Sequence, residues 1–94
     1  MRVRWLRLAL RDLDAADAFI VQDNPQAATA VILRIVRTVS MLKEQPGIGR
    51  AGRVPGTKEL VIPDTRYIVP YRVKDDTVDI LRVYHSSRKW PDFL

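Results

Sequence analysis

Two helical stripes, separated by a break of three residues, constrain the fold of this chain more than any other feature. Apolar residues between Leu8 and Val21 recur at spacings of three and four, which is the pattern of an amphipathic helix. A second stripe begins after Asn24-Pro25, a good helix cap followed by a residue suited to the first helical turn, and runs to about Gln45. Because only two or three residues connect the stripes, we predict an antiparallel helical hairpin.

Short apolar runs before and after the hairpin predict strands. One covers Arg2 to Leu6, and three follow one another at Thr57–Pro63, Tyr67–Lys74 and Thr77–His85. The turns between the last three are short, so these strands should pair antiparallel. Pro70 removes one hydrogen bond from the middle strand of the three, so we expect a bulge there or an edge-like exposure.

The order β-α-α-β-β-β defines one α+β domain covering residues 1–94, because a chain of 94 residues is too short for two cores. We predict that the helical hairpin packs on a four-stranded, mostly antiparallel sheet. The strands are apolar on both faces, and helices are available for only one of them. We therefore expect the second face to be a binding surface.

Composition excludes several classes of site. The chain has no cysteine and one histidine, which rules out disulfides and makes a structural zinc site a poor fit. We expect no metal and no cofactor. No apolar run approaches the roughly 20 residues of a membrane span, and the N-terminus lacks the apolar centre of a signal peptide. We therefore place the protein in the cytoplasm, away from membranes.

Positive charge is concentrated in the middle of the chain. The net charge is +5, and residues 50–72 hold five Lys or Arg against two Asp or Glu, which is +3 within 23 residues. Such a segment attracts nucleic acid or an acidic protein, and charge alone does not distinguish them from a solubilising surface. The candidate anion-binding residues are Arg50, Arg53, Lys58, Arg66, Arg72, Arg82 and Arg88.

His85, at the end of the last predicted strand, is the one side chain suited to proton transfer near neutral pH. The alternative is a histidine whose ring is satisfied by a backbone carbonyl. Glu59 could act as a base, although a cross-strand pair with an arginine is the commoner arrangement. Trp90 and the tyrosines Tyr67, Tyr71 and Tyr84 suit either base stacking or the core.

Three stretches together resemble the RelE/ParE superfamily of bacterial toxins from type II toxin–antitoxin modules. The first is Val3-Arg4-Trp5 with Asp12-Leu13, and the second is Asn24-Pro25 with Ala27-Ala28. The third runs from Gly49 to Val61, continues through Tyr67–Val73, and closes with Leu81–His85 and Arg88-Lys89-Trp90-Pro91. The resemblance covers nearly the whole chain and agrees with the predicted element order.

The resemblance implies a growth inhibitor that a cognate acidic antitoxin neutralises by wrapping an extended or helical segment over it. It also implies that operator DNA is contacted through the antitoxin. An upstream reading frame for a short acidic protein would support such a module. Members of the superfamily act either on DNA gyrase, like ParE, or as ribosome-dependent mRNA endonucleases, like RelE.

Two positions favour the ParE-like mechanism. RelE-like enzymes commonly carry an arginine after the tyrosine that starts the third strand, where this chain has Ile68. The aromatic residue near the end is Trp90 instead of the usual tyrosine, and an indole cannot serve as an acid. Arg88 does match the C-terminal arginine of the nucleases, and His85 lies near the place of a histidine in some of them.

We therefore predict a gyrase-directed toxin, with the segment Arg82–Leu94 most important for activity. The residues expected to bind the target or the antitoxin are Arg50, Arg53, Arg82, Arg88 and Trp90. The alternative is an mRNA endonuclease, in which Lys58 and Arg88 hold the phosphate and His85 exchanges the proton. A third possibility is a toxin that has lost its activity and only binds its partner.

Overall fold

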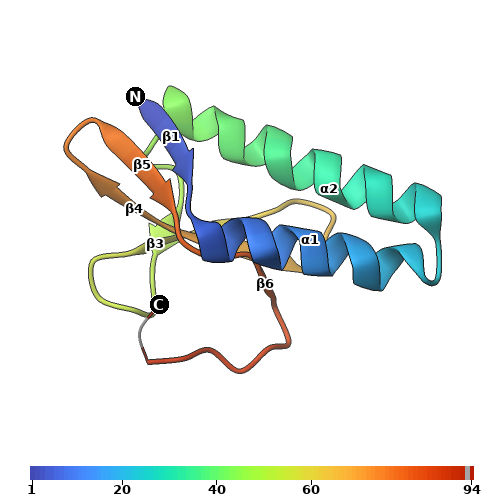
Figure 1. Cartoon of the computed structure of the whole chain (residues 1–94). Helices are drawn as coiled ribbons and strands as arrows, with labels where there is room; N and C mark the ends of the chain where they lie inside the picture. The colour runs from blue at the N-terminus through green and yellow to red at the C-terminus, as the bar shows by residue number, and fades with distance from the viewer. Residues whose placement is uncertain (93) are drawn as a thin grey trace.

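The computed structural model describes residues 1–92 and 94 and arranges them as a helical layer on a sheet (Figure 1). Helix α1 spans Arg7–Val21 and helix α2 spans Pro25–Ser40. The Asn24 side chain accepts a hydrogen bond of 3.1 Å from the Ala27 N–H, and Pro25 occupies the first turn. The predicted helical hairpin is confirmed. Helix α2 ends before Gln45, because a 3₁₀ turn, η1 (Met41–Lys43), tightens the chain after Ser40.

The sheet has six strands, where the sequence predicted four. They are β1 (Arg2–Trp5), β2 (Arg50–Ala51), β3 (Lys58–Val61), β4 (Tyr67–Lys74), β5 (Thr77–Ile80) and β6 (Tyr84–His85). Their order is β1-β5-β4-β3-β2, with β6 also paired to β4. Strand β1 runs parallel to β5 and the other pairs are antiparallel. The α+β class and the mostly antiparallel sheet are as predicted.

The two additional strands have separate origins. Strand β2 comes from the basic loop, where Arg50 and Ala51 pair with Glu59 and Lys58. Strand β6 arises because the predicted strand Thr77–His85 is interrupted after Ile80. Two-residue strands of this kind carry too little pattern for a sequence to reveal.

The interruption is a one-residue register shift opposite Pro70. Tyr71 is paired with Ile80 and Tyr67 with His85, so the β5–β6 stretch advances five residues while β4 advances four. The Pro70 carbonyl accepts a hydrogen bond of 3.0 Å from Leu81, but its ring nitrogen cannot donate one in return. The expected bulge is therefore present. The edge-like exposure is not, because Pro70 is fully buried in a central strand.

The core lies between the helices and one face of the sheet. Val69 and Tyr71 of β4 point into it, together with Val78 and Ile80 of β5. The Tyr71 hydroxyl donates to the Pro46 carbonyl (2.8 Å) and accepts from the Gly49 N–H (2.9 Å). This side chain therefore ties the turn after η1 to the centre of the sheet.

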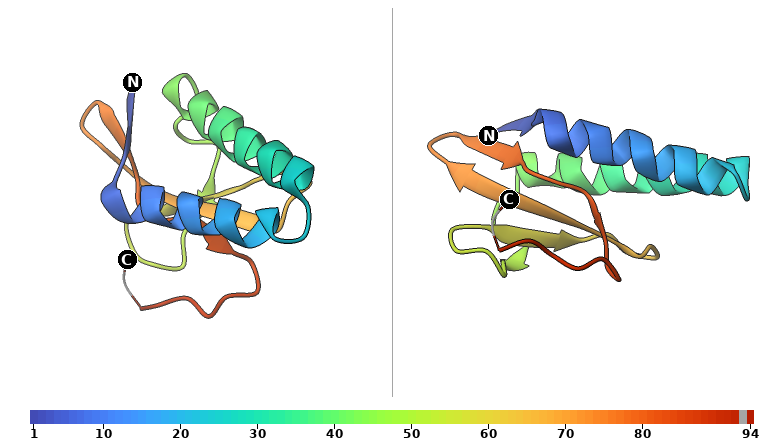
Figure 2. Two further views of the ribbon diagram at one scale, coloured as in Figure 1. Left: turned by 45° about the vertical axis from the view of Figure 1, so that its right-hand side comes forward. Right: turned by 60° about the horizontal axis from the view of Figure 1, so that its bottom comes forward.

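We call the other side of the sheet the outer face; by strand alternation it carries Arg4, Glu59, Pro70, Arg72, Asp79 and Tyr84. The chain after β6 runs along the side of the sheet away from the helices (Figure 2). Tyr84 is fully buried there against Trp90, with ring centroids 5.0 Å apart. The second apolar face is therefore not wholly free for a partner, because the chain's own end covers part of it.

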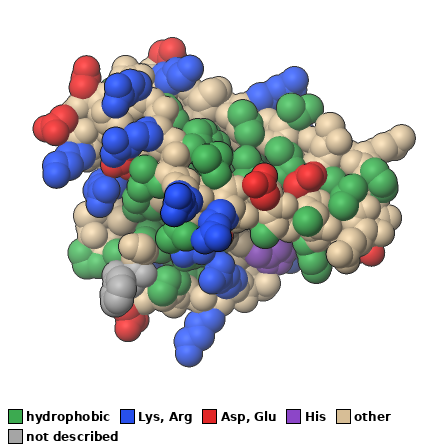
Figure 3. Space-filling view, viewed as in Figure 1, with side chains coloured by type: hydrophobic (Ala, Val, Ile, Leu, Met, Phe, Trp, Pro, Cys, Tyr) green, Lys and Arg blue, Asp and Glu red, His purple; other side chains and the backbone are tan. Residues whose placement is uncertain are grey.

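Lys and Arg side chains gather in a band on the surface shown in Figure 3. The band runs from the end of the sheet near the β4–β5 turn towards the segment after β6. Among the described residues, no helix is long and apolar enough to cross a membrane.

Candidate functional site at the C-terminal end

Asp12 of α1 anchors the stretch that joins β5 to β6. Its carboxylate accepts two hydrogen bonds from the Arg82 guanidinium (2.7 and 3.0 Å) and one from the Val83 N–H (3.0 Å). Both charged side chains are largely buried, with 14% of Asp12 and 17% of Arg82 exposed. The hydrogen bonds that Arg82 donates to Asp12 raise the pKa of Arg82, and burial opposes that effect. Arg82, predicted as a binding residue, is therefore engaged inside the molecule.

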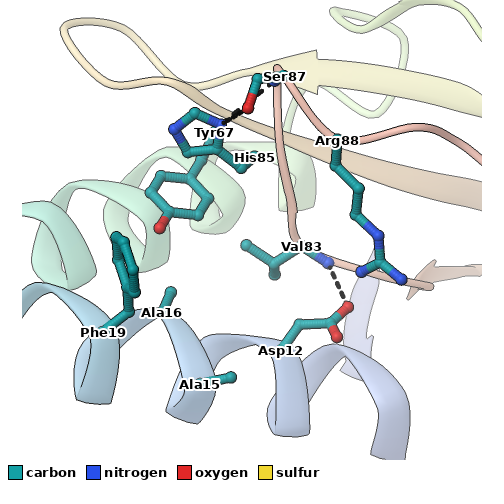
Figure 4. Close-up of a pocket in the computed structure, with 9 residues that line it drawn as sticks. All are labelled: Asp12, Ala15, Ala16, Phe19, Tyr67, Val83, His85, Ser87 and Arg88. Carbon is teal, nitrogen blue, oxygen red and sulfur yellow. Dashed lines mark hydrogen bonds between the residues drawn. The ribbon is translucent and has the colours of Figure 1, made fainter.

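A cavity of about 370 Å³ lies between α1 and the segment after β6 (Figure 4). Phe19 and Tyr67 lie on one side of it, Asp12 and Arg88 lie on the other, and His85 is beside Tyr67. The Tyr67 ring meets the His85 ring edge-on, with centroids 5.4 Å apart. Burial raises the pKa of the Tyr67 hydroxyl, which therefore remains protonated at neutral pH.

The His85 ring is held by Ser87. Its Nδ1 accepts the Ser87 backbone N–H at 3.2 Å and lies 2.7 Å from the Ser87 hydroxyl oxygen. The backbone contact favours the tautomer of the neutral ring with its proton on Nε2, because the Ser87 hydroxyl can either donate to Nδ1 or accept from it. In that tautomer the nitrogen that would accept a proton from a ligand is engaged by Ser87, and not by the backbone carbonyl considered from the sequence.

Cation–π contacts hold the segment after β6 to the sheet. The Arg88 and Arg82 guanidinium carbons lie 4.4 and 4.8 Å from the centroid of the Tyr84 ring. Trp90 packs edge-on against Tyr84, and the Arg53 guanidinium lies 4.0 Å above the Trp90 ring. Arg53, Arg88 and Trp90, three of the predicted binding residues, are thus brought together.

Glu59 holds the basic loop against the sheet. It is 1% exposed and accepts hydrogen bonds from the Arg50 side chain (2.9 and 3.0 Å) and from the Arg53 backbone N–H (2.8 Å). The Arg53 guanidinium lies 3.5 Å from the same carboxylate. The expected cross-strand pair of Glu59 with an arginine is confirmed, since Arg50 is its partner in the β2–β3 register.

Lys58 is separate from the residues it was expected to join. It is paired with Tyr71, whereas His85 is paired with Tyr67 on the other side of β4. From the usual spacing along and between strands, the two Cα atoms lie about 17 Å apart. Arg88 does lie close to His85, because its N–H donates to the His85 carbonyl at 3.0 Å.

Sequence reasoning missed two carboxylates and one aromatic residue. Asp12 counted only towards the family resemblance and Asp79 gave no signal, because their partners Arg82 and Arg4 are 70 and 75 residues away in the chain. Phe19 of α1 is 69% exposed at the rim of the cavity, and an apolar residue off the stripe of the helix was its only signal. Within the described part of the chain, no cluster of His, Asp or Glu side chains could hold a metal ion.

A family model, two related proteins and a solved structure all match this chain. Residues 3–90 match the family model of the ParE toxin of type II toxin–antitoxin systems, parDE. The toxin candidate Y4kP of Sinorhizobium fredii is 47% identical over 99% of this chain and 96% of its own length. Toxin RelE2 of Caulobacter vibrioides is 34% identical over 93% of this chain and 97% of its own length.

A solved structure of the chromosomal ParDE TA system from P. aeruginosa superposes with a TM-score of 0.80 and 34% identity. The match covers 90% of this chain and 95% of the other. A helical hairpin on a mixed sheet, with a basic C-terminal segment, is thus the fold of a RelE/ParE-superfamily toxin. The chain belongs to the ParE toxin family of type II toxin–antitoxin systems.

Proposed function

We propose that this toxin inhibits bacterial growth by acting on DNA gyrase in the cytoplasm. The observation that carries the proposal is the state of the residues that RNA cleavage would need. The acceptor nitrogen of His85 is engaged by Ser87, and Lys58 lies on a different part of the sheet. A proton acceptor and two cations around one phosphate are therefore not assembled, whereas binding to a protein target requires no such set.

We further propose that an acidic antitoxin neutralises the toxin, and that the complex contacts operator DNA through the antitoxin. Exposed apolar side chains on α1 support a protein partner, since Phe19 at the cavity is 69% exposed and Leu8, on the same side of the helix, is 44% exposed. The net charge of +5 suits a partner of opposite charge. Co-expression of an upstream reading frame for a short acidic protein, where one is found, should restore growth.

The order in which macromolecular synthesis fails tests the target. DNA and protein synthesis should be pulse-labelled in bacteria within minutes of inducing this chain alone. A gyrase-directed toxin lowers DNA labelling first, whereas an endonuclease lowers protein labelling first. Absence of any growth defect beside a stable antitoxin complex would indicate a protein that only binds its partner.

Purified components give the same test without the complexity of the cell. The toxin is incubated with gyrase, ATP and relaxed plasmid, and supercoiling and DNA cleavage are measured. We expect loss of supercoiling or accumulation of cleaved plasmid, and no cleavage of mRNA on purified ribosomes. Toxin saturated with its antitoxin is the matched control for both assays.

The second candidate is a ribosome-dependent mRNA endonuclease, favoured by the shared position of His85 and Arg88 at one cavity. The variant His85→Gln separates the two functions, because glutamine keeps a polar side chain of similar reach but cannot exchange a proton near neutral pH. A gyrase-directed toxin should keep its toxicity in this variant. Complete loss of toxicity with an unchanged melting temperature would favour the endonuclease.

A further inference from the structure

Two buried carboxylates on the outer face are each held between two arginines. Glu59 lies between Arg50 and Arg53, and Asp79 accepts hydrogen bonds from Arg4 (2.9 Å) and Arg72 (3.2 Å). The carboxylate side chains are 1% and 5% exposed, whereas the four arginine side chains are between 46% and 56% exposed. We call each set a carboxylate clamp.

The two clamps are neighbours on one surface. Glu59 is paired with Pro70 and Asp79 with Arg72, and these two residues of β4 point to the same side of the sheet. From strand spacings, the Cα atoms of the two carboxylate residues lie about 12 Å apart. Four half-exposed guanidinium groups therefore lie together on the outer face.

Burying a carboxylate is costly, and a buried ion pair is rarely the most stable solution at its position. The clamps do hold the guanidinium groups of their arginines in fixed orientations. Each guanidinium has five N–H donors, and the hydrogen bonds among the described residues use one on Arg4, one on Arg72 and two on Arg50. The remaining donors of held side chains are free for an anionic ligand at little cost in side-chain entropy.

We propose that the outer face binds the phosphate backbone of duplex DNA through the arginines of the two clamps, with Glu59 and Asp79 as positioning residues. Arginine forks match phosphate oxygens in a bidentate manner, and contacts of this kind bind without reading sequence. The proposal goes beyond the action on gyrase and is independent of it. It also differs from operator recognition, which needs contacts with base edges.

The surroundings of the clamps favour a duplex over other polyanions. Single-stranded nucleic acid is held by stacking on exposed aromatic rings, but Tyr84 is fully buried and Trp90 lies between Tyr84 and Arg53. An acidic peptide would gain most from apolar contacts, and most of the exposed large apolar residues, Phe19 and Leu8 among them, belong to the helical layer; Val61 of β3 is the exposed one beside Glu59 on the outer face. Backbone phosphates need only the cations.

Acidic residues bound the surface at one end. Asp75 and Asp76 form the turn between β4 and β5, directly after Lys74. They lie next to Arg2, whose backbone N–H donates a hydrogen bond to the Asp76 carbonyl. A polyanion is therefore expected to lie across the strands over the clamps and away from this turn. The experiments below change the four arginines of the clamps, which are Arg4, Arg72, Arg50 and Arg53.

Fluorescence anisotropy of a labelled 20-base-pair duplex with purified toxin, in the absence of gyrase, measures this binding as salt is raised. Four phosphate contacts predict a slope of about −3.6 in log K against log salt, or about 150-fold weaker binding at 200 mM than at 50 mM. The double variant Arg4→Gln/Arg53→Gln leaves each carboxylate one arginine. Its slope should fall to about −1.8, or about 12-fold over the same range.

The matched control is Arg11→Gln/Arg37→Gln, which removes the same charge from exposed positions on α1 and α2. We expect its slope to stay near that of the wild type. Equal loss in both double variants would overturn the assignment to the outer face, and so would the absence of duplex binding at 50 mM salt. Tighter binding of single-stranded RNA, or of polyglutamate, would assign the face to that polymer instead.

A separate measurement tests whether Glu59 positions its arginines for DNA binding. Glu59→Gln removes one negative charge and so raises the net charge by one, as does Asp17→Asn at an exposed position of α1. If Glu59 orients its arginines, the first variant weakens DNA binding while the second strengthens it slightly. An equal gain in affinity for both would show that charge alone matters.

Should Glu59→Gln fail to fold, Arg50→Lys and Arg72→Lys keep both the charge and a partner for each carboxylate while removing the fork. They should weaken duplex binding severalfold compared with Arg37→Lys. Unchanged affinity in both would overturn the role of oriented guanidinium groups. Inhibition of gyrase supercoiling, measured separately, shows whether the action on gyrase stands or fails independently.

Discussion

Asp12 is one residue of α1 that fixes two features of the C-terminal region. Its carboxylate accepts hydrogen bonds from the Arg82 side chain and from the Val83 backbone N–H. It therefore fixes both the position of the Arg82 guanidinium and the path of the chain between β5 and β6. Few side chains in the molecule join such distant parts of the sequence. This makes Asp12 a sensitive point for stability.

Asp12→Asn should lower the free energy of unfolding by about 2–4 kcal/mol, because Arg82 loses its ionic partner while remaining largely buried. Urea denaturation followed by circular dichroism measures the loss. The control is Arg34→Gln, which breaks an ion pair with Asp64 whose side chains are 49% and 80% exposed. That variant should change stability by less than about 1 kcal/mol. Similar effects of the two changes would contradict the importance of the Asp12 anchor.

Gly49 is a position where the absence of a side chain is required. A Cβ atom there would lie 2.6 Å from the Tyr71 hydroxyl oxygen and 2.7 Å from a ring carbon. Gly49→Ala should therefore cost about 1–3 kcal/mol by forcing the Tyr71 ring or the turn to move. Gly47→Ala is the matched control, because a Cβ at Gly47 meets no atom within 4 Å. A thermal melt of both variants decides the point, and equal melting temperatures would exclude the close contact.

Residue-level prediction succeeded where partners are close in the chain. Glu59 and Arg50 are nine residues apart on neighbouring strands, so a cross-strand pair could be expected. The Asp79–Arg4 and Asp12–Arg82 pairs depend on the parallel pairing of β1 with β5 and on the docking of α1. Neither arrangement is encoded in a local pattern. A single sequence therefore gives the candidate cations but not which carboxylates hold them.

At the scale of elements, periodicity predicted both helices and their hairpin, because each stripe is long and its cap chemistry is clear. It gave the existence of strands β3 and β4 as well. It failed for β2 and for the break between β5 and β6. Those features depend on which strand lies alongside, and Pro70 was the only local indication of the break.

The segment after β6 is an element without regular structure, held by side chains alone. Trp90→Ala should release it, since the contacts with Arg53 and Tyr84 disappear together, at a cost of about 2 kcal/mol. Hydrogen exchange of residues 86–92 should become faster while that of α2 does not change. We also expect reduced toxicity, because the sequence predicts this segment to be the most important for activity.

Trp90→Phe is the control for that change. It keeps a ring between Tyr84 and Arg53 and removes the indole N–H, which is buried without a hydrogen-bond partner among the described residues. Loss of an unpaired donor offsets the smaller ring, so stability should be nearly unchanged. Equal acceleration of exchange in both variants would contradict a docking role for the aromatic ring.

At the scale of the whole molecule, the dependence of stability on pH reports the charged network of the outer face. The hydrogen bond from Arg4 lowers the pKa of Asp79 below its ordinary range; burial opposes this effect, and Arg72 adds to it. A lowered folded-state pKa contributes stability that is complete above the unfolded pKa of about 3.9 and is lost as pH falls through the folded value.

Wild type and Asp79→Asn should therefore differ most in unfolding free energy above about pH 5, and the difference should shrink below about pH 4. Urea denaturation between pH 2.5 and pH 7 measures it. Asp17→Asn, at an exposed position of α1, should show a difference near zero throughout. A constant gap between wild type and Asp79→Asn across the range would mean that the arginines do not stabilise the charged carboxylate.

The extra residue between Ile80 and Tyr84 determines what each side of the molecule displays. It leaves Tyr84 on the outer face, beneath Trp90, and His85 beside α1 at the cavity. Regular pairing of the same residues with β4, without the bulge, would place Tyr84 opposite Tyr67 and so exchange the two, with Tyr84 facing the helices and His85 facing outward. A slip of one residue in this pairing would thus give an unchanged sequence a different surface, and a change of partner would require no substitution at all.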